Sequence, residues 1–322
     1  MVLESKTGQG EPQPPSVMAR QLTRRKFLRA AGGLVLGTAM MGIGGMAYAT
    51  KIEPGWIDIV SMDLTLPRLS PAFDGFRLVQ ISDIHISRAL TGAQVSEAAR
   101  LALDLKPDLV ALTGDFVDER KLLTQLSAEL ADALRPLVSQ VQSIAVLGNH
   151  DYRMGAPVIR EMLAGLGIQE LDNDVLTLQR GGDVFHFAGV DDPWNGYPRL
   201  RRVTSLLPEN GAAVLLAHEP DYADISAAVG RFDLQISGHS HGGQVVPPGL
   251  GPLVLPYMGR KYPAGLYQVG KMLQYTNRGL GMTAPYLRLN CRPEITLFTF
   301  KTGEIAQSHD LYPGSALARQ AG

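Results

Sequence analysis

The stretch Leu78-Val79-Gln80-Ile81-Ser82-Asp83-Ile84-His85 contains an apolar run that ends abruptly at a carboxylate and an imidazole. Alternate side chains of an extended segment point the same way, so Asp83 and His85 are placed to bind one metal ion together. Residues 76–82 are therefore expected to form a strand with a metal site at its carboxyl end.

Four further apolar runs end in the same manner. They lead to Asp115, to Asn149 with His150 and Asp151, to His218, and to His239 with His241. Five of the seven histidines of the chain lie at such ends, although His218 taken alone would be interpreted as a structural histidine. Because ligands bind beyond the carboxyl ends of the strands in open α/β sheets, we expect these side chains to meet in space.

The composition is that of an ordinary globular protein, since 45% of the 322 residues are hydrophobic and 19% are charged. Residues 1–49 carry six Lys or Arg and two Glu, which leaves the rest of the chain mildly acidic. An acidic body argues against binding to nucleic acid. The single cysteine, Cys291, allows no intramolecular disulfide.

The N-terminal region resembles a twin-arginine export signal. Arg24 and Arg25 lie in a basic cluster, and the uncharged stretch Ala30–Thr50 that follows ends in the cleavage pattern Ala47-Tyr48-Ala49. The resemblance implies the twin-arginine export machinery as a partner and a place in the periplasm or cell envelope. An uncleaved membrane anchor is the alternative, because 21 uncharged residues can span a bilayer. We expect residues 1–50 to be this signal or anchor, 51–302 one catalytic domain, and 303–322 a loose polar tail.

Hydrophobic periodicity predicts an α/β core. An alternating edge strand is expected between Ile57 and Leu66, and helices are expected over Gln94–Leu105, Arg120–Leu137 and Pro157–Leu166. Later apolar runs predict strands over Val175–Gln179, Val184–Val190, Leu266–Val269, Met272–Thr276, Tyr286–Leu289 and Glu294–Phe300. We expect these later strands to form a second, largely antiparallel sheet, and we assign His186 to packing within it.

Seven of the strand-end residues form a set of oxygen and nitrogen ligands without a thiolate. They are Asp83, His85, Asp115, Asn149, His218, His239 and His241. This set exceeds the needs of one divalent cation and suits two that share a bridging carboxylate; manganese, iron and zinc all accept such ligands. Two close cations can hold a bridging hydroxide as nucleophile and bind phosphoryl oxygens, which is the chemistry of phosphate ester hydrolysis.

His150 is then free to protonate the leaving oxygen or to neutralise developing charge, with Asp151 holding its other ring nitrogen. The alternative is that His150 is a further metal ligand.

These motifs together resemble the signature of the calcineurin-like metallophosphoesterases. The resemblance rests on Asp83-Ile84-His85, Gly114-Asp115-Phe116-Val117-Asp118, Gly148-Asn149-His150-Asp151, His218 and Gly238-His239-Ser240-His241. It implies a four-layer α/β/β/α sandwich of two mixed sheets flanked by helices. It further implies one metal site from Asp83, His85, Asp115 and His241, a second from Asp115, Asn149, His218 and His239, and His150 as acid or charge stabiliser.

A narrower resemblance covers about residues 55–300. The segments Gly242-Gly243-Gln244-Val245, Gly259-Arg260-Lys261-Tyr262 and Arg278-Gly279-Leu280-Gly281 are similar to those of exported or membrane-bound bacterial phosphodiesterases. Some relatives in that branch act on glycolipid precursors such as UDP-2,3-diacylglucosamine. A small-molecule or lipid-linked phosphate ester is therefore the expected substrate.

Basic and aromatic residues outside the metal set are candidates for substrate binding. Arg260 and Lys261 follow His241 closely and are predicted to contact phosphate. Arg199, Arg201 and Arg202 are either pocket residues or part of a solvated face. The expected function is that of a dinuclear-metal phosphodiesterase or pyrophosphatase. The alternatives are a phosphomonoesterase, including a phosphoprotein phosphatase, and a non-catalytic envelope metal-binding protein.

Overall fold

The structure is a computed structural model that describes residues 44–303. Arg24, Arg25 and most of the predicted signal and tail lie outside these residues. Among the residues described, no helix combines the length and the apolar character needed to cross a bilayer.

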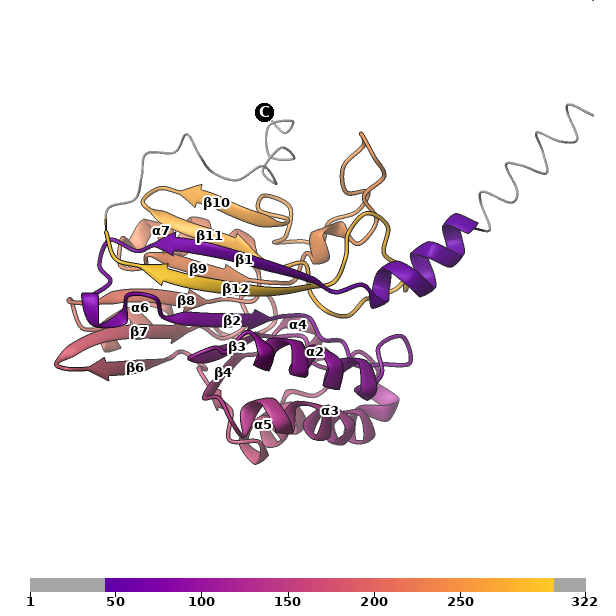
Figure 1. The fold of residues 1–322 in the computed structure, drawn as a ribbon, viewed down its shortest axis with the longest axis horizontal. Coiled ribbons are helices and arrows are strands. Elements are labelled where there is room, and N and C mark those ends of the chain that lie inside the picture. Colours follow the sequence, from indigo (N-terminus) through magenta and orange to yellow (C-terminus); the bar gives the residue numbers. More distant parts are fainter. Residues whose placement is uncertain (1–43, 304–322) are drawn as a thin grey trace, which may run out of the picture. The chain divides into compact units, whose positions relative to one another are not determined.

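Two six-stranded mixed sheets form the centre of the fold (Figure 1). The first has the order β1 (Asp58–Thr65), β12 (Glu294–Lys301), β2 (Arg77–Ile81), β3 (Leu109–Thr113), β4 (Ser143–Val146) and β5 (Gln169–Glu170). The second has the order β10 (Gly265–Val269), β11 (Met272–Thr276), β9 (Leu234–Ser237), β8 (Ala212–Leu216), β7 (Asp183–Gly189) and β6 (Asp174–Arg180). The predicted edge strand is confirmed as β1.

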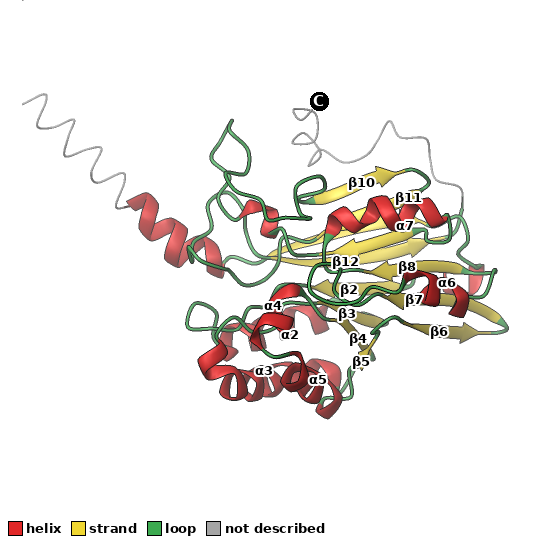
Figure 2. Cartoon of the chain, turned by 180° about the vertical axis from the view of Figure 1, so that it is seen from behind, coloured by secondary structure: helices red, strands yellow, loops and turns green. Residues whose placement is uncertain are grey.

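Helices cover the outer faces of the sheets (Figures 1 and 2). Beside the first sheet are α2 (Gly92–Asp104), α3 (Leu123–Val138), α4 (Asn149–Met154) and α5 (Ala156–Gly165); beside the second are α6 (Leu200–Leu206) and α7 (Ala223–Val229). Short helical turns are η1 (Tyr48–Ile52), η2 (Glu53–Gly55), η3 (Pro71–Phe73), η4 (Arg120–Leu122), η5 (Pro220–Tyr222) and η6 (His241–Gly243). The predicted α/β/β/α sandwich is thus confirmed.

The central strands are apolar on both faces because each sheet is covered on both sides. In β2, Val79 packs in the cluster shared with α2 and α3, whereas Leu78 packs between the sheets. In β8, Val214 faces the space between the sheets and Leu215 packs in the cluster that includes residues of α6 and α7. This alternation explains why the metal-bearing strands appear in the sequence as continuous hydrophobic runs.

Three expectations about the second sheet are wrong. The strand predicted at Glu294–Phe300 is β12, which lies in the first sheet between β1 and β2. The interior of the second sheet is parallel, since β7, β8 and β9 pair in parallel and β11 joins β9 in parallel, so the sheet is not largely antiparallel. Tyr286–Leu289 is not a strand and makes only an isolated bridge between Leu289 and Val245. The helices α6 and α7 supply the crossovers that parallel pairing requires, and both are too short to give a clear helical period.

Candidate metal centre

The side chains predicted to bind metal converge at the carboxyl ends of strands from both sheets. Asp83 follows β2, Asp115 follows β3, and Asn149 follows β4, all in the first sheet; His218 follows β8 and His239 follows β9 in the second. Gln80 connects the sheets next to this point, because its amide nitrogen donates to Thr113 Oγ1 and to the Ser237 carbonyl oxygen, both at 2.9 Å. The site is therefore built across the interface between the two sheets.

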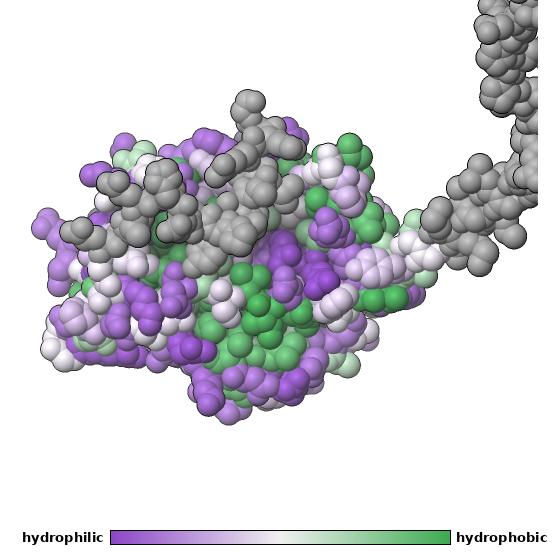
Figure 3. All heavy atoms as spheres, turned by 45° about the horizontal axis from the view of Figure 1, so that its top comes forward, coloured by the Kyte–Doolittle hydropathy of each residue, from purple (hydrophilic) through white to green (hydrophobic). Residues whose placement is uncertain are grey.

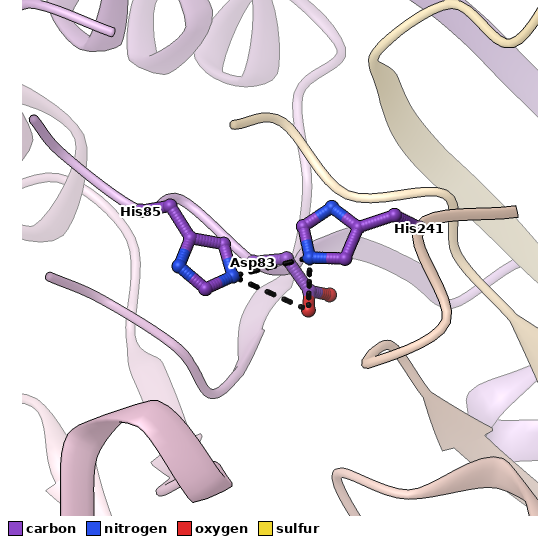
Figure 4. A group of neighbouring side chains, drawn as sticks. All are labelled: Asp83, His85 and His241. Carbon is purple, nitrogen blue, oxygen red and sulfur yellow. Dashed lines mark hydrogen bonds and ion pairs between the residues drawn. The ribbon is translucent and has the colours of Figure 1, made fainter. Parts of the chain in front are cut away.

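The first group of candidate ligands comprises Asp83, His85 and His241 (Figure 4). The Nε2 atoms of the two histidines are 3.1 Å apart, and His241 Nε2 is 3.4 Å from Asp83 Oδ1. Figure 4 shows both rings pointing toward the Asp83 carboxylate from opposite sides. All three side chains are buried, so their lone pairs face one another with little competition from water.

The second group comprises Asp115, His218 and His239. Asp115 Oδ2 is 3.1 Å from His218 Nε2 and 3.4 Å from His85 Nε2, so this one carboxylate lies between the two groups. Asn149 belongs beside the second group, because its Oδ1 is 3.0 Å from His239 Nδ1. The structure thus brings all seven predicted ligands together.

The backbone is strained at five of these ligands. Asp83, His85, Asp115, His239 and His241 have φ angles of 49°, 45°, 59°, 70° and 51°, a region that non-glycine residues rarely occupy. Such conformations persist only where the surrounding structure holds them, and they cluster at functional sites. This backbone strain lowers the stability of the fold, and it directs these side chains toward one place.

The donor set fits divalent cations. His218 is buried, and its Nδ1 is 2.6 Å from the Thr113 carbonyl oxygen, which leaves Nε2 directed at Asp115 without a hydrogen bond of its own among the residues described. A ring fixed at one nitrogen with the other one open is the usual arrangement of a metal-binding histidine. Gly148 is also required here, because a Cβ at this position would lie 2.7 Å from His218 Nε2.

Burial and mutual charge control protonation in the site. Burial together with the nearby Asp115 raises the pKa of Asp83 to about 6, and burial lowers the pKa of His85 to about 4 and that of His239 to about 3. Burial acts against charge on His218, yet Asp115 and Asp83 raise its pKa well above the usual value. His85 and His239 are thus neutral, whereas the raised pKa of His218 reflects the negative field of Asp115 and Asp83, which would equally attract a metal cation.

Asp118 is the partner of His150, and the expectation that Asp151 would hold this ring is wrong. His150 Nδ1 is 2.6 Å from Asp118 Oδ1. Asp151 instead accepts from the backbone N–H groups of Asp115, Phe116 and Gly148 at 2.8, 2.8 and 2.9 Å. The Asp151 carboxylate is therefore buried against backbone N–H groups at the start of α4, whereas the partly buried His150 ring pairs with Asp118.

Sequence reasoning gave Asp118 no role, although it lies three residues after Asp115 in a quoted motif. The spacing becomes informative only once the bridge between Ile86 and Val117 is known, which places Asp118 beside the segment that carries His85. His85 Nδ1 is 3.8 Å from Asp118 Oδ1, and the His85 and His150 ring centroids are 4.6 Å apart.

Arg153, Trp194 and Tyr257 form a wall beside the second ligand group, here called the aromatic wall. The Trp194 ring centroid lies 5.8 Å from that of His239 and 5.6 Å from that of Tyr257, and the Arg153 guanidinium carbon is 5.7 Å from the Trp194 ring. Arg153 Nε donates to the Asn149 carbonyl oxygen at 3.3 Å. All three side chains are exposed, so this wall is open to a ligand.

The positions predicted to bind phosphate have other contacts. Lys261 Nζ is 2.7 Å from Asp224 Oδ1, and the backbone N–H groups of Arg260 and Lys261 donate to the Asp221 carboxylate. Phosphate binding by Arg260 and Lys261 stays a prediction. His186 packs as expected, since its two ring nitrogens lie 2.9 Å from Thr177 Oγ1 and 3.0 Å from the Asn210 carbonyl oxygen.

Comparison with known proteins agrees with this geometry. Residues 76–243 match the family described as calcineurin-like phosphoesterase. The chain is 34% identical over 285 residues to YkuE of Bacillus subtilis, an uncharacterized metallophosphoesterase, with 88% of this chain and 99% of that protein covered. It is 32% identical over 282 residues to the phosphodiesterase YaeI of Escherichia coli, with 86% and 98% covered.

A more distant relative is the UDP-2,3-diacylglucosamine pyrophosphatase LpxG of Chlamydia muridarum, which is 25% identical over 294 residues, with 73% of this chain and 86% of that protein covered. The family match spans about half of the chain, and two relatives exceed 30% identity over nearly their whole length. The chain therefore belongs to the calcineurin-like phosphoesterases, which are hydrolases of phosphoester bonds.

Proposed function

We propose that this chain is a metal-dependent phosphodiesterase or pyrophosphatase of the cell envelope. One observation carries the proposal: the Asp115 carboxylate lies within 3.4 Å of His85 Nε2 and 3.1 Å of His218 Nε2, between two buried ligand groups. A carboxylate in that place is suited to bridge two cations. Two divalent cations held there would supply Lewis acidity and an activated water for attack on phosphorus.

The residues of the chain orient the substrate and move one proton. With Nδ1 of His150 bonded to Asp118, the Nε2 atom is the one left to carry a proton to the leaving oxygen. His150 is only partly buried, whereas the metal ligands around it are buried. The ring is thus reachable by a substrate that enters from solvent.

The aromatic wall favours a substrate with a substituent on both sides of the phosphorus. Arg153 is exposed, and none of the ion pairs within residues 44–303 involves it, so its charge is available to a second phosphoryl group. Trp194 and Tyr257 offer ring faces for a sugar or a base. A phosphomonoester with a small substituent would leave these groups unused.

The names of two relatives agree with this proposal, since one is a phosphodiesterase and another a pyrophosphatase of UDP-2,3-diacylglucosamine. A glycolipid precursor of that kind is the substrate we would test first. The envelope location is supported by the sequence of residues 23–50 alone, and it includes export by the twin-arginine machinery.

The test is turnover by protein reconstituted separately with manganese, iron and zinc. We expect hydrolysis of an aryl phosphodiester to exceed that of the matching monoester, and hydrolysis of a nucleotide-sugar pyrophosphate to exceed both. Faster turnover of the monoester would favour a phosphomonoesterase. Metal-loaded protein that hydrolyses none of the three would contradict the enzymatic proposal and leave a metal-binding protein.

A further inference from the structure

Residues 247–257, here called the apolar loop, expose an unusual run of large hydrophobic side chains. Leu250 and Val254 are each 76% exposed, Leu253 is 57% exposed and Tyr257 is 58% exposed. A single exposed apolar side chain is ordinary, but four within eight residues form a patch of the kind that marks an interaction site. Figure 3 shows hydrophobic side chains at the upper right edge of the molecule, where Figure 1 draws the orange loop that follows β9.

The chemistry of the apolar loop suits lipid better than protein. From Gly242 to Gly259 the sequence contains no Asp, Glu, Lys or Arg. Contacts between proteins are surrounded by a polar and charged rim that fixes partner choice, and this segment offers none. Insertion into a bilayer instead requires a segment without charges, because every charged side chain opposes transfer from water into the hydrocarbon.

The apolar loop follows the metal centre closely in the sequence and contacts it at its C-terminal end. The loop begins shortly after His241, and Leu253 N donates to the Val245 carbonyl oxygen at 3.1 Å. At the other end, the Tyr257 carbonyl oxygen is 2.8 Å from His239 Nε2. Whatever contacts the apolar loop is therefore brought next to the catalytic ligands.

A second uncharged segment ends beside the base of this loop. The stretch Ala30–Thr50 is long enough to span a bilayer as a helix, and near its end Arg288 N donates to the Ala49 carbonyl oxygen at 2.9 Å. The next residue, Leu289, pairs with the base of the loop, since its N–H donates to Gln244 and its carbonyl accepts from Val246. One short segment thus joins the end of the bilayer-length stretch to the apolar loop.

We propose that the apolar loop inserts into a lipid surface and presents the metal centre to phosphate esters carried by lipids. The substrate part of this inference rests on the proposed phosphoesterase function, whereas the insertion itself does not. A free, soluble phosphate ester would gain nothing from such a loop. A lipid-linked one would reach the metal ligands with its scissile phosphate at the level of the headgroups.

The insertion is tested by fluorescence quenching in the full-length chain. Cys291 is buried, so Leu253→Cys provides the accessible thiol for an environment-sensitive dye. Leu206→Cys is the matched control, because Leu206 is exposed and belongs to α6, which lies at the opposite end of the fold from the loop in Figure 1. Each labelled protein is mixed with vesicles of phosphatidylethanolamine and phosphatidylglycerol that contain a nitroxide-labelled lipid.

We expect the nitroxide lipid to quench the dye at position 253 several-fold more strongly than the dye at position 206. An N-terminal anchor alone would hold position 253 near the vesicle surface but outside the acyl chains. The nitroxide is therefore placed deep on the acyl chain, and quenching at position 253 no stronger than at position 206 would overturn the proposal. A blue shift of the dye at position 253 that grows with protein concentration in the absence of vesicles would also overturn it, and would indicate a second copy of this chain as the partner.

The substrate part is tested with Val254→Asp, which introduces charge on the loop at a distance from the ligands. We expect the rate for a lipid-linked diester in vesicles, divided by the rate for a soluble aryl diester, to fall about tenfold or more. An unchanged ratio would refute the lipid-linked substrate. Wild-type protein that turns over neither substrate would contradict the proposed function, and the quenching comparison would still decide the insertion.

Discussion

Asp151 is predicted to hold the metal centre together without taking part in the chemistry, and two substitutions test this. Its buried carboxylate accepts three backbone N–H groups, those of Asp115, Phe116 and Gly148. In Asp151→Asn, the amide oxygen can still accept from the N–H groups of Asp115 and Gly148, which share Oδ2 in the wild type. The NH₂ group then faces the N–H of Phe116, which loses its acceptor. In Asp151→Ala all three donors lose their acceptor.

The magnitude follows from the number of donors left unpaired. One buried donor without a partner costs about 1–3 kcal/mol, so Asp151→Asn should lower the free energy of unfolding by about 2 kcal/mol and Asp151→Ala by about 3 kcal/mol or more. At about 2–4 °C per kcal/mol for a domain of this size, the melting temperature should fall by about 4–8 °C for Asn and further for Ala. Burial of the carboxylate reduces both costs, because charge is disfavoured there.

The assay is thermal unfolding by circular dichroism in excess chelator, so that differences in metal binding do not contribute. Asp132→Asn is the control, because the Asp132 side chain is 83% exposed in α3 and should show no measurable change. If Asp151→Asn melted like the wild type yet turned over substrate a hundredfold more slowly, Asp151 would act in catalysis and the structural role would be refuted.

Three further results are expected. His150→Ala should retain both metals, and its kcat should fall by a factor of about 10²–10⁴, the usual contribution of a general acid. Asp118→Asn should lower kcat by a smaller factor and shift the pH dependence of kcat. A normal kcat in either variant would exclude the proton transfer proposed here. Asp115→Asn should weaken the binding of both metals in a calorimetric titration, and weakening of one alone would exclude the bridge. Arg24→Lys with Arg25→Lys should trap the precursor inside the cell in a fractionation experiment, and normal export would remove the twin-arginine hypothesis.

The sequence predicted well which side chains converge, because strand ends carry a strong local signal. An apolar run that stops at Asp83 or Asp115 indicates both the strand and the polar side chain that follows its carboxyl end. The order of the strands carries no such signal, because pairing depends on the twist and packing of the whole sheet. The sequence therefore predicts a largely antiparallel second sheet, although β8 and β9 pair in parallel.

Contacts between distant segments escaped prediction for the same reason. The pairing of His150 with Asp118 depends on how two segments that are 32 positions apart along the chain come together. Arg153 is one charged residue among many in the sequence, and only its position over Trp194 distinguishes it. Asp151 was assigned to the wrong partner because adjacency in sequence favoured His150, whereas the turn of α4 directs the two side chains apart.

The most direct test of the two-cation site is anomalous diffraction from crystals grown with manganese. Two anomalous peaks are predicted, one bound by Asp83, His85 and His241 and the other by His218 and His239, with Asp115 contacting both. A single peak, or peaks that lie away from Asp115, would contradict the bridging role of this carboxylate and with it the proposed mechanism.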